Sequence, residues 1–182
     1  MLIMLCISAT TSATTDEGVV IDGIRWATRN VATPGTFTEN PEDFGMFFQW
    51  NRKKAWNTSD IDVDNWEQSP SVENMNELCP AGWRLPTEEE LWSLMVAGSA
   101  WATLGDVPGS VFGRAPNQIF LPAAGWRDSY DGELNSAGRE GSYWGNNENN
   151  DGRVLHLWFV RGNMGVAWAD KTHGFSLRCV AE

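Results

Sequence analysis

The chain has 182 residues, of which 42% are hydrophobic, so it can bury a core without dividing into two domains. Its formal net charge of −11 at pH 7 argues against nucleic acids and acidic membrane surfaces as partners, because phosphate binding requires a basic surface. Eleven tryptophans and eighteen glycines, against two tyrosines, favour short strands and irregular loops held by large aromatic side chains.

The N-terminal residues resemble the latter part of a secretory signal. Residues 1–13 are mostly apolar, end in small side chains and lack a preceding Lys or Arg, which indicates a truncated or atypical leader over residues 1–14. The run is too short to span a bilayer, so we expect an exported domain over residues 15–182 without direct membrane insertion. After removal of such a leader Cys79 and Cys179 remain, and a pair in an exported chain is more often a disulfide than two free thiols.

The first third of the chain contains one predicted hairpin and a long irregular stretch. Residues 19–26 combine β-branched side chains with a Gly-containing turn, which predicts a strand or hairpin. The aromatic run over residues 44–50 predicts core packing rather than a ligand role. Residues 51–77 show no clear period, and we expect Trp56 and Trp66 to tether this excursion.

A helix is predicted after Pro86. Thr87 can cap it, and Glu90 can reach back to complete a capping box. Leu91 and Leu94 fall on one stripe, and Gly98 is placed to end the helix. The acidic residues of the first turn suit the positive end of the helix, which explains them better than an active-site pair, because no base or nucleophile accompanies them.

The middle of the chain is expected to be mostly loop. Residues 99–117 are rich in Gly and Pro and predict a loop with a short helical turn, before apolar structure returns over residues 119–127. The carboxylates of Asp128, Asp131 and Glu133 suggest calcium, but their spacing lacks the alternating ligands and distal Glu of an EF-hand loop. Turn chemistry explains them, and we expect neither a metal ion nor a cofactor.

The C-terminal segment combines a rigid frame with an alternating strand. Residues 138–144 and 174–180 mix glycines with aromatic side chains that need burial. Residues 155–160 and 164–168 predict a β-hairpin whose turn contains Gly and Asn, followed by a closing strand over residues 175–180. Alternation predicts that the first strand of the hairpin turns Leu155, Leu157 and Phe159 inward and His156, Trp158 and Val160 outward.

A series of motifs covers nearly everything after the leader. The motifs are 26–31 (WATRNV), 48–50 (FQW), 79–87 (CPAGWRLPT), 121–127 (LPAAGWR), 131–132 (DG), 141–144 (GSYW) and 174–180 (GFSLRCV). In this order they resemble the Fibrobacter succinogenes major paralogous domain, which is common in exported proteins of gut Bacteroidetes. The resemblance implies an α+β, C-type lectin-like fold of the formylglycine-generating-enzyme type, with paired termini, a small twisted antiparallel sheet, one or two helices and long loops.

The same domain resembles variable proteins of diversity-generating retroelements, which place their mutable codons in the C-terminal segment. Adenine-directed mutagenesis changes Asn codons most readily, whereas Trp cannot arise directly from an Asn codon. An ordinary paralogue diversified by gene duplication would carry the same frame. The resemblance implies ligand contacts at Asn146, Asn147, Asn149, Asn150, His156, Trp158, Val160, Asn163, Val166, Trp168, Asp170 and Thr172.

These observations predict a non-enzymatic recognition or adhesion domain, secreted or at the cell surface, whose ligand is a protein or glycan on another cell, phage or host surface. The sugar-selecting triplets of calcium-dependent lectins do not occur. A structural or tip domain of a surface assembly is an alternative, and the oligomeric state stays open. A formylglycine-generating-type enzyme is a further alternative, but it needs closely placed reactive cysteines with metal, so we expect no catalytic residue. His156 and His173 are more often packing or surface residues than a metal pair.

Overall fold

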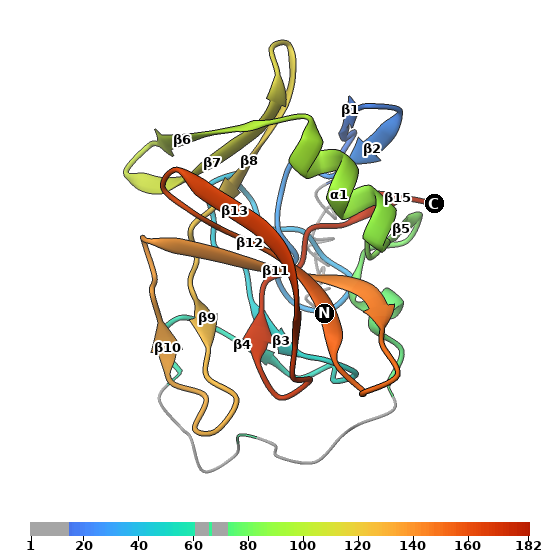
Figure 1. Cartoon of the computed structure of the whole chain (residues 1–182), viewed down its shortest axis with the longest axis vertical. Helices are drawn as coiled ribbons and strands as arrows, with labels where there is room; N and C mark the ends of the chain where they lie inside the picture. Colours follow the sequence, from blue (N-terminus) through green and yellow to red (C-terminus); the bar gives the residue numbers. More distant parts are fainter. Residues whose placement is uncertain (1–14, 61–65, 67–72) are drawn as a thin grey trace, which may run out of the picture.

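The computed structural model describes residues 15–60, 66 and 73–182 (Figure 1). The leader expected over residues 1–14 lies outside this part of the chain. In the described residues, short antiparallel strands form four sheets, and a single short α-helix accompanies them. This β-rich, α+β arrangement agrees with the expected fold class at that level. No helix among the described residues is long and apolar enough to cross a membrane.

The first sheet brings the two ends of the described chain together. Its hairpin confirms the strand pair predicted over residues 19–26, because Asp22 and Gly23 both adopt positive φ in a two-residue turn. Val180 pairs with Trp26, so the last strand lies beside the first hairpin. The strand order is β1 (Val19–Ile21), β2 (Ile24–Trp26), β15 (Val180–Ala181) and β5 (Trp83–Arg84).

The second sheet holds the aromatic run that was predicted to fill the core. Phe47 and Phe48 are fully buried, and Trp56 packs against Trp66 with ring centroids 5.3 Å apart. Part of the stretch predicted as irregular is regular, since it contains β4 and the 3-10 helix η2 (Met75–Leu78). The strand order is β10 (Leu134–Asn135), β9 (Trp126–Arg127), β14 (Gly174–Phe175), β3 (Phe47–Gln49) and β4 (Ala55–Trp56).

The predicted closing strand over residues 175–180 is divided between two sheets, because β14 and β15 join different neighbours. The residues between them make backbone hydrogen bonds, of Ser176 with β11 and of Leu177 and Cys179 with residues 31 and 27. Arg178 adds side-chain contacts, because it is fully buried and its Nη2 donates to Asn30 Oδ1 at 2.7 Å and to the Phe120 carbonyl oxygen at 3.1 Å. A buried guanidinium needs such partners, so Arg178 helps to hold this segment in place.

The third sheet contradicts the loop predicted over residues 99–117. The Gly and Pro residues that suggested a loop lie in two-residue turns and within the strands. A Cβ on Gly109 would collide with the Leu121 carbonyl oxygen, so glycine is required there by the close approach of two strands. The strands are β6 (Ser99–Leu104), β7 (Val107–Arg114) and β8 (Asn117–Pro122).

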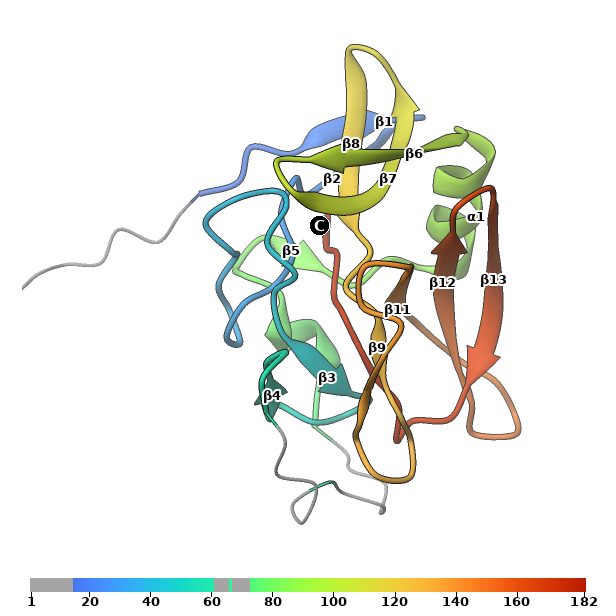
Figure 2. The same cartoon turned by 90° about the vertical axis from the view of Figure 1, so that its left-hand side faces the viewer.

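The predicted helix is α1 (Glu88–Val96). The capping box is confirmed, because Thr87 Oγ1 accepts from the Glu90 amide and Glu90 Oε2 accepts from the Thr87 amide. Leu91 and Leu94 are buried, and Gly98 follows the helix with a φ of 88°. In Figure 2 the helix lies beside one end of β12 (Val154–Val160) and β13 (Asn163–Ala169).

The fourth sheet contains β11 (Glu140–Glu148), β12 (Val154–Val160) and β13 (Asn163–Ala169) in that order. Strands β12 and β13 confirm the hairpin predicted in the C-terminal segment, with residues 161–162 as its turn. Figure 2 shows this sheet at the right-hand side of the molecule, where β12 and β13 lie outermost.

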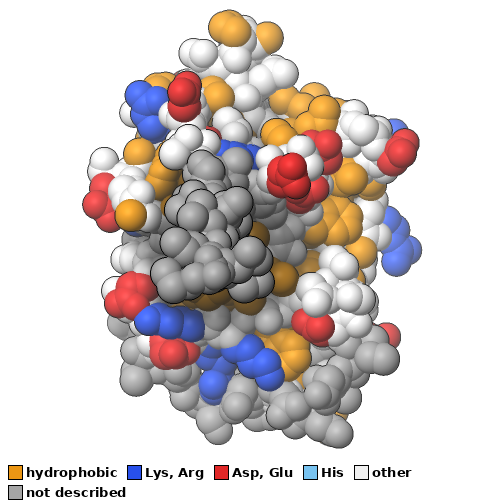
Figure 3. Space-filling model, turned by 180° about the vertical axis from the view of Figure 1, so that it is seen from behind, with side chains coloured by type: hydrophobic (Ala, Val, Ile, Leu, Met, Phe, Trp, Pro, Cys, Tyr) orange, Lys and Arg blue, Asp and Glu red, His pale blue; other side chains and the backbone are white. Residues whose placement is uncertain are grey.

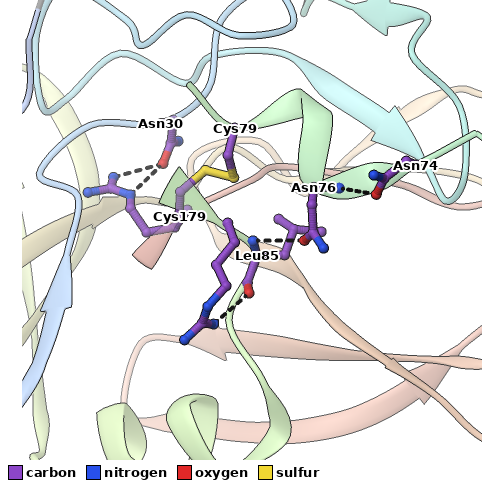
Figure 4. The surroundings of a disulfide bond; sticks show 8 residues. Asn30, Asn74, Asn76, Cys79, Leu85 and Cys179 are labelled. Atoms are coloured by element: carbon purple, nitrogen blue, oxygen red, sulfur yellow. Dashed lines mark hydrogen bonds between the residues drawn. A yellow bond between two sulfur atoms is a disulfide. The ribbon is translucent and has the colours of Figure 1, made fainter. Parts of the chain in front are cut away.

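A disulfide joins Cys79 to Cys179, as expected from the cysteine count. Both cysteines are buried in the core, and Figure 4 shows the bond between the turn after η2 and the segment that precedes β15. The bond therefore connects the middle of the chain to its C-terminal strand.

Figure 3 shows the back of the molecule, where basic and acidic side chains are interspersed. The residues drawn in colour form no broad patch of one charge sign.

Candidate functional site

The inner face of the β11–β12–β13 sheet is part of the core. Leu155, Leu157 and Phe159 are buried to 2% exposure or less, as alternation predicted, and the same cluster contains Leu91 and Leu94 of α1. Burial of three large apolar side chains on one strand is worth several kcal/mol, so this face holds the hairpin in place. Side chains on the opposite face are therefore less constrained by the packing of the hairpin.

The outer face carries His156, Trp158 and Val160, which point away from the buried set but are half-buried rather than fully exposed. Trp158 is paired with Ser142 on β11 and with Gly165 on β13. Its indole lies over Gly165, because a Cβ at that position would stand 2.9 Å from Trp158 Nε1. Small neighbours on both sides let the large ring lie against the sheet.

His156 corrects the expectation of a solvent-facing imidazole. Its ring is 4.6 Å from the Phe175 ring and 6.1 Å from the Trp144 ring, measured between centroids. The cause is the segment of β14 and the following Ser176, which runs beside β11 at this end of the outer face through a parallel bridge between Tyr143 and Ser176. Burial lowers the pKa of His156 to about 4, outweighing a backbone hydrogen bond with Ala167 that raises it, and His173 lowers it further.

A hollow of about 320 Å³ lies on this part of the outer face, and Phe175 of β14 is among its lining residues. We call it the outer-face hollow. It collects residues from β9, from all three strands of the fourth sheet and from the segment that contains β14, so distant parts of the chain meet there. Its lining residues are Trp126, Glu140, Ser142, Arg153, His156, Trp168, Ala169, Asp170, His173 and Phe175.

Charged groups lie at both ends of the outer-face hollow. Glu140 and Ser142 belong to the start of β11, and Ser142 Oγ donates to Glu140 Oε1 at 3.5 Å. Arg153 and Asp170 flank the paired ends of β12 and β13 at the opposite end of the sheet, and they form an ion pair of 3.3 Å. Both members of this pair are more than half exposed, which leaves donors and acceptors open to a ligand.

Two predicted contact residues lie on the inner face of the sheet. Register pairs Val166 with Leu157 and Trp168 with Leu155. Val166 packs partly against the core, so it is not presented with the outer-face residues. Trp168 is 38% exposed at the edge strand, where it also borders the outer-face hollow.

The predicted asparagine contacts divide into structural and exposed residues. Asn147 Oδ1 accepts from the Glu88 amide at 2.7 Å and therefore supports the start of α1. Asn149 Oδ1 accepts from the amides of Asp151 and Arg153 and shapes the turn between β11 and β12. Asn150 is exposed in that same turn.

Three further predicted positions lie around the outer face. Asn146 is half-buried, and its amide donates to the Pro86 carbonyl oxygen at 2.9 Å. Asn163 is exposed beside the hairpin turn. Thr172 is half-buried, and its carbonyl oxygen accepts from Gln49 Nε2 at 3.0 Å, which anchors the segment before β14.

Several residues of the hollow were missed from the sequence. Glu140 and Ser142 alternate with the inward Gly141 and Tyr143, so strand periodicity would have placed them on the outer face. The local sequence gives no sign that Trp126 and His173 line the hollow. Trp126 comes from β9 in another sheet, and His173 comes from the loop before β14. Their rings meet edge to face with centroids 5.4 Å apart.

The side chains of the outer face are suited to non-covalent contacts with a ligand. His156 stays uncharged at neutral pH and contributes a ring rather than a cation. Among residues 15–60, 66 and 73–182, no group of three or more His, Cys, Asp or Glu side chains is arranged to hold a metal ion. No family model, curated protein or solved structure matches this chain.

Proposed function

We propose that this protein is a non-enzymatic, exported ligand-binding domain of the C-type lectin-like type, similar to the Fibrobacter succinogenes major paralogous domain. Its binding face consists of the outer face of β11–β12–β13 and the outer-face hollow. The ligand is a protein or glycan on another cell, phage or host surface. The pairing of both chain ends, the packing of α1 against the sheet and the quoted motifs support this assignment.

The proposal depends mainly on the difference between the two faces of β12, of which one is buried in the core and the other carries Trp158. The inner residues are buried and secure the hairpin, so substitutions at the half-buried Trp158 and Val160 of the outer face affect contacts more than stability. Trp158 supplies a large, rigid ring that lies beside Ser142 and hence beside the hollow. Such aromatic side chains dominate binding energies when a partner buries them.

If a retroelement diversifies this segment, fewer positions can vary without structural cost than the sequence suggested. Asn150, Asn163 and Asp170 are exposed and could change at little structural cost. Asn147 and Asn149 hold the helix start and a turn, so their replacement has a structural consequence. A reverse transcriptase gene with a near-copy of this segment in neighbouring DNA would support retroelement diversification, and its absence would favour an ordinary paralogue.

The binding face is tested by replacing Trp158 with Ala. We expect Trp158→Ala to reduce binding of the labelled protein to intact bacterial or epithelial cells at least about tenfold, because a buried hot-spot tryptophan contributes roughly 2 kcal/mol or more. Flow cytometry over a concentration series measures the apparent affinity. The melting temperature should change by only a few degrees, because the ring is half-buried.

Trp92→Ala is the matched control, because Trp92 is 44% exposed on α1, outside the binding face. Its cell binding should equal that of the unmodified protein. Equal binding by the Trp158→Ala variant, or equal loss in both variants, would contradict the proposed binding face.

A further inference from the structure

The outer-face hollow has a continuous aromatic floor. The His156 and His173 rings flank Phe175 with centroid separations of 4.6 Å and 5.4 Å. Trp126 extends the floor from His173. Phe175 is only 4% exposed and Trp126 meets His173 edge to face, so it is the half-buried rings of His156, His173 and Trp126 that are open to flat, weakly polar groups such as the C–H face of a ring.

The ends of the hollow have the opposite character. Glu140 supplies acceptors at one end, and the exposed ion pair of Arg153 and Asp170 supplies both donors and acceptors at the other. Hydrogen bonds with ionised groups are roughly twice as strong as those between neutral groups. A ligand that fits must therefore combine an apolar ring face with an edge that both donates and accepts hydrogen bonds.

We infer that the outer-face hollow binds a short saccharide, so that the ligand of this domain is a glycan. This inference rests on the proposed function. A pyranose ring has apolar C–H faces and a rim of hydroxyls, each of which both donates and accepts. The volume of about 320 Å³ lies at the lower end of small-molecule sites and suits one or two sugar rings. A protein interface of standard size would require a much larger contact.

Binding is direct and independent of calcium. Calcium takes six to eight oxygen ligands, whereas the hollow contains two carboxylate side chains, Glu140 and Asp170. Asp170 is also already paired with Arg153. The saccharide hydroxyls therefore bond to these side chains themselves rather than to a metal ion.

The test uses the cells that bind the intact protein, treated with periodate, which cleaves the vicinal diols of sugars and leaves the polypeptide backbone intact. We expect periodate to abolish binding and EDTA to leave it unchanged. Arg153→Gln should weaken binding to untreated cells roughly tenfold, because it removes charged hydrogen-bond donors from the hollow. The variant should fold normally, since the Arg153 side chain is 54% exposed.

Lys53→Gln is the matched control, because it breaks an equally exposed ion pair with Glu77 and does not line the hollow. Its binding should equal that of the unmodified protein. Binding that survives periodate but is lost after protease treatment would identify a protein partner and overturn the saccharide inference. Such a result would leave the proposed binding face standing, provided that Trp158→Ala still reduced binding at least about tenfold. Unchanged binding by Arg153→Gln would also overturn the inference.

Discussion

His156 lies on the outer face of its strand and is nevertheless packed among aromatic rings. Strand periodicity determines the direction of a side chain, but burial depends on what covers that side. Here Phe175 of β14 covers the imidazole. Because the ring is buried without charge, its pKa of about 4 lies below the usual 6.5.

This depressed pKa predicts a loss of stability in mild acid. The unfolded chain takes up a proton at His156 near pH 6.5, whereas the folded protein resists protonation until about pH 4. The stabilisation is therefore present above pH 6.5 and is lost as the pH falls towards 4, by up to about 3 kcal/mol. Urea unfolding of the unmodified protein and of His156→Phe across this range measures the difference. Parallel pH profiles for the two proteins would show that His156 does not titrate in this way.

At the scale of elements, the last residues of β11 support the start of α1. Asn147 bonds to the Glu88 amide from outside the helix, adding to the capping box of Thr87 and Glu90. The first turn of a helix leaves backbone amides without partners inside the helix, so this contact stabilises α1 on the sheet. The neighbouring Asn150 has an exposed side chain in the turn.

The two asparagines should therefore differ when each is replaced by Ala. We expect Asn147→Ala to lower the free energy of unfolding by about 1 kcal/mol, because it removes a hydrogen bond to a helix-start amide. Asn150→Ala should change it by less than about 0.5 kcal/mol. Chemical denaturation followed by circular dichroism measures both values, and equal effects would contradict the structural role of Asn147.

At the scale of the molecule, the disulfide ties the C-terminal segment to the middle of the chain. Cys79 and Cys179 are separated by 100 residues, and their bond restricts the unfolded chain over that length. We expect the double variant Cys79→Ala and Cys179→Ala to lose roughly 2–5 kcal/mol of stability, as a lower melting temperature. Reductant should lower the melting temperature of the unmodified protein but not that of the double variant. An equal response of the two proteins to reductant would refute this role.

The sequence determined the elements that depend on neighbours within a few residues. The Asp22–Gly23 turn, the Thr87 capping box and the alternation in β12 all follow from local backbone preferences or strand period. The same local reasoning failed over residues 99–117, where tertiary pairing places Gly and Pro within a three-stranded sheet. A high content of Gly and Pro does not show which of these residues lie in turns and which lie inside strands.

The composition of the proposed binding face depends on tertiary packing. Phe175 reaches His156 because the segment after Gly174 runs beside β11, and Trp126 comes from a different sheet. These contacts join residues that are far apart in sequence, so no local period or spacing encodes them. The sequence determined which side of β12 faces away from the core, whereas the packing of remote segments decided which part of that side is covered and which part forms a hollow.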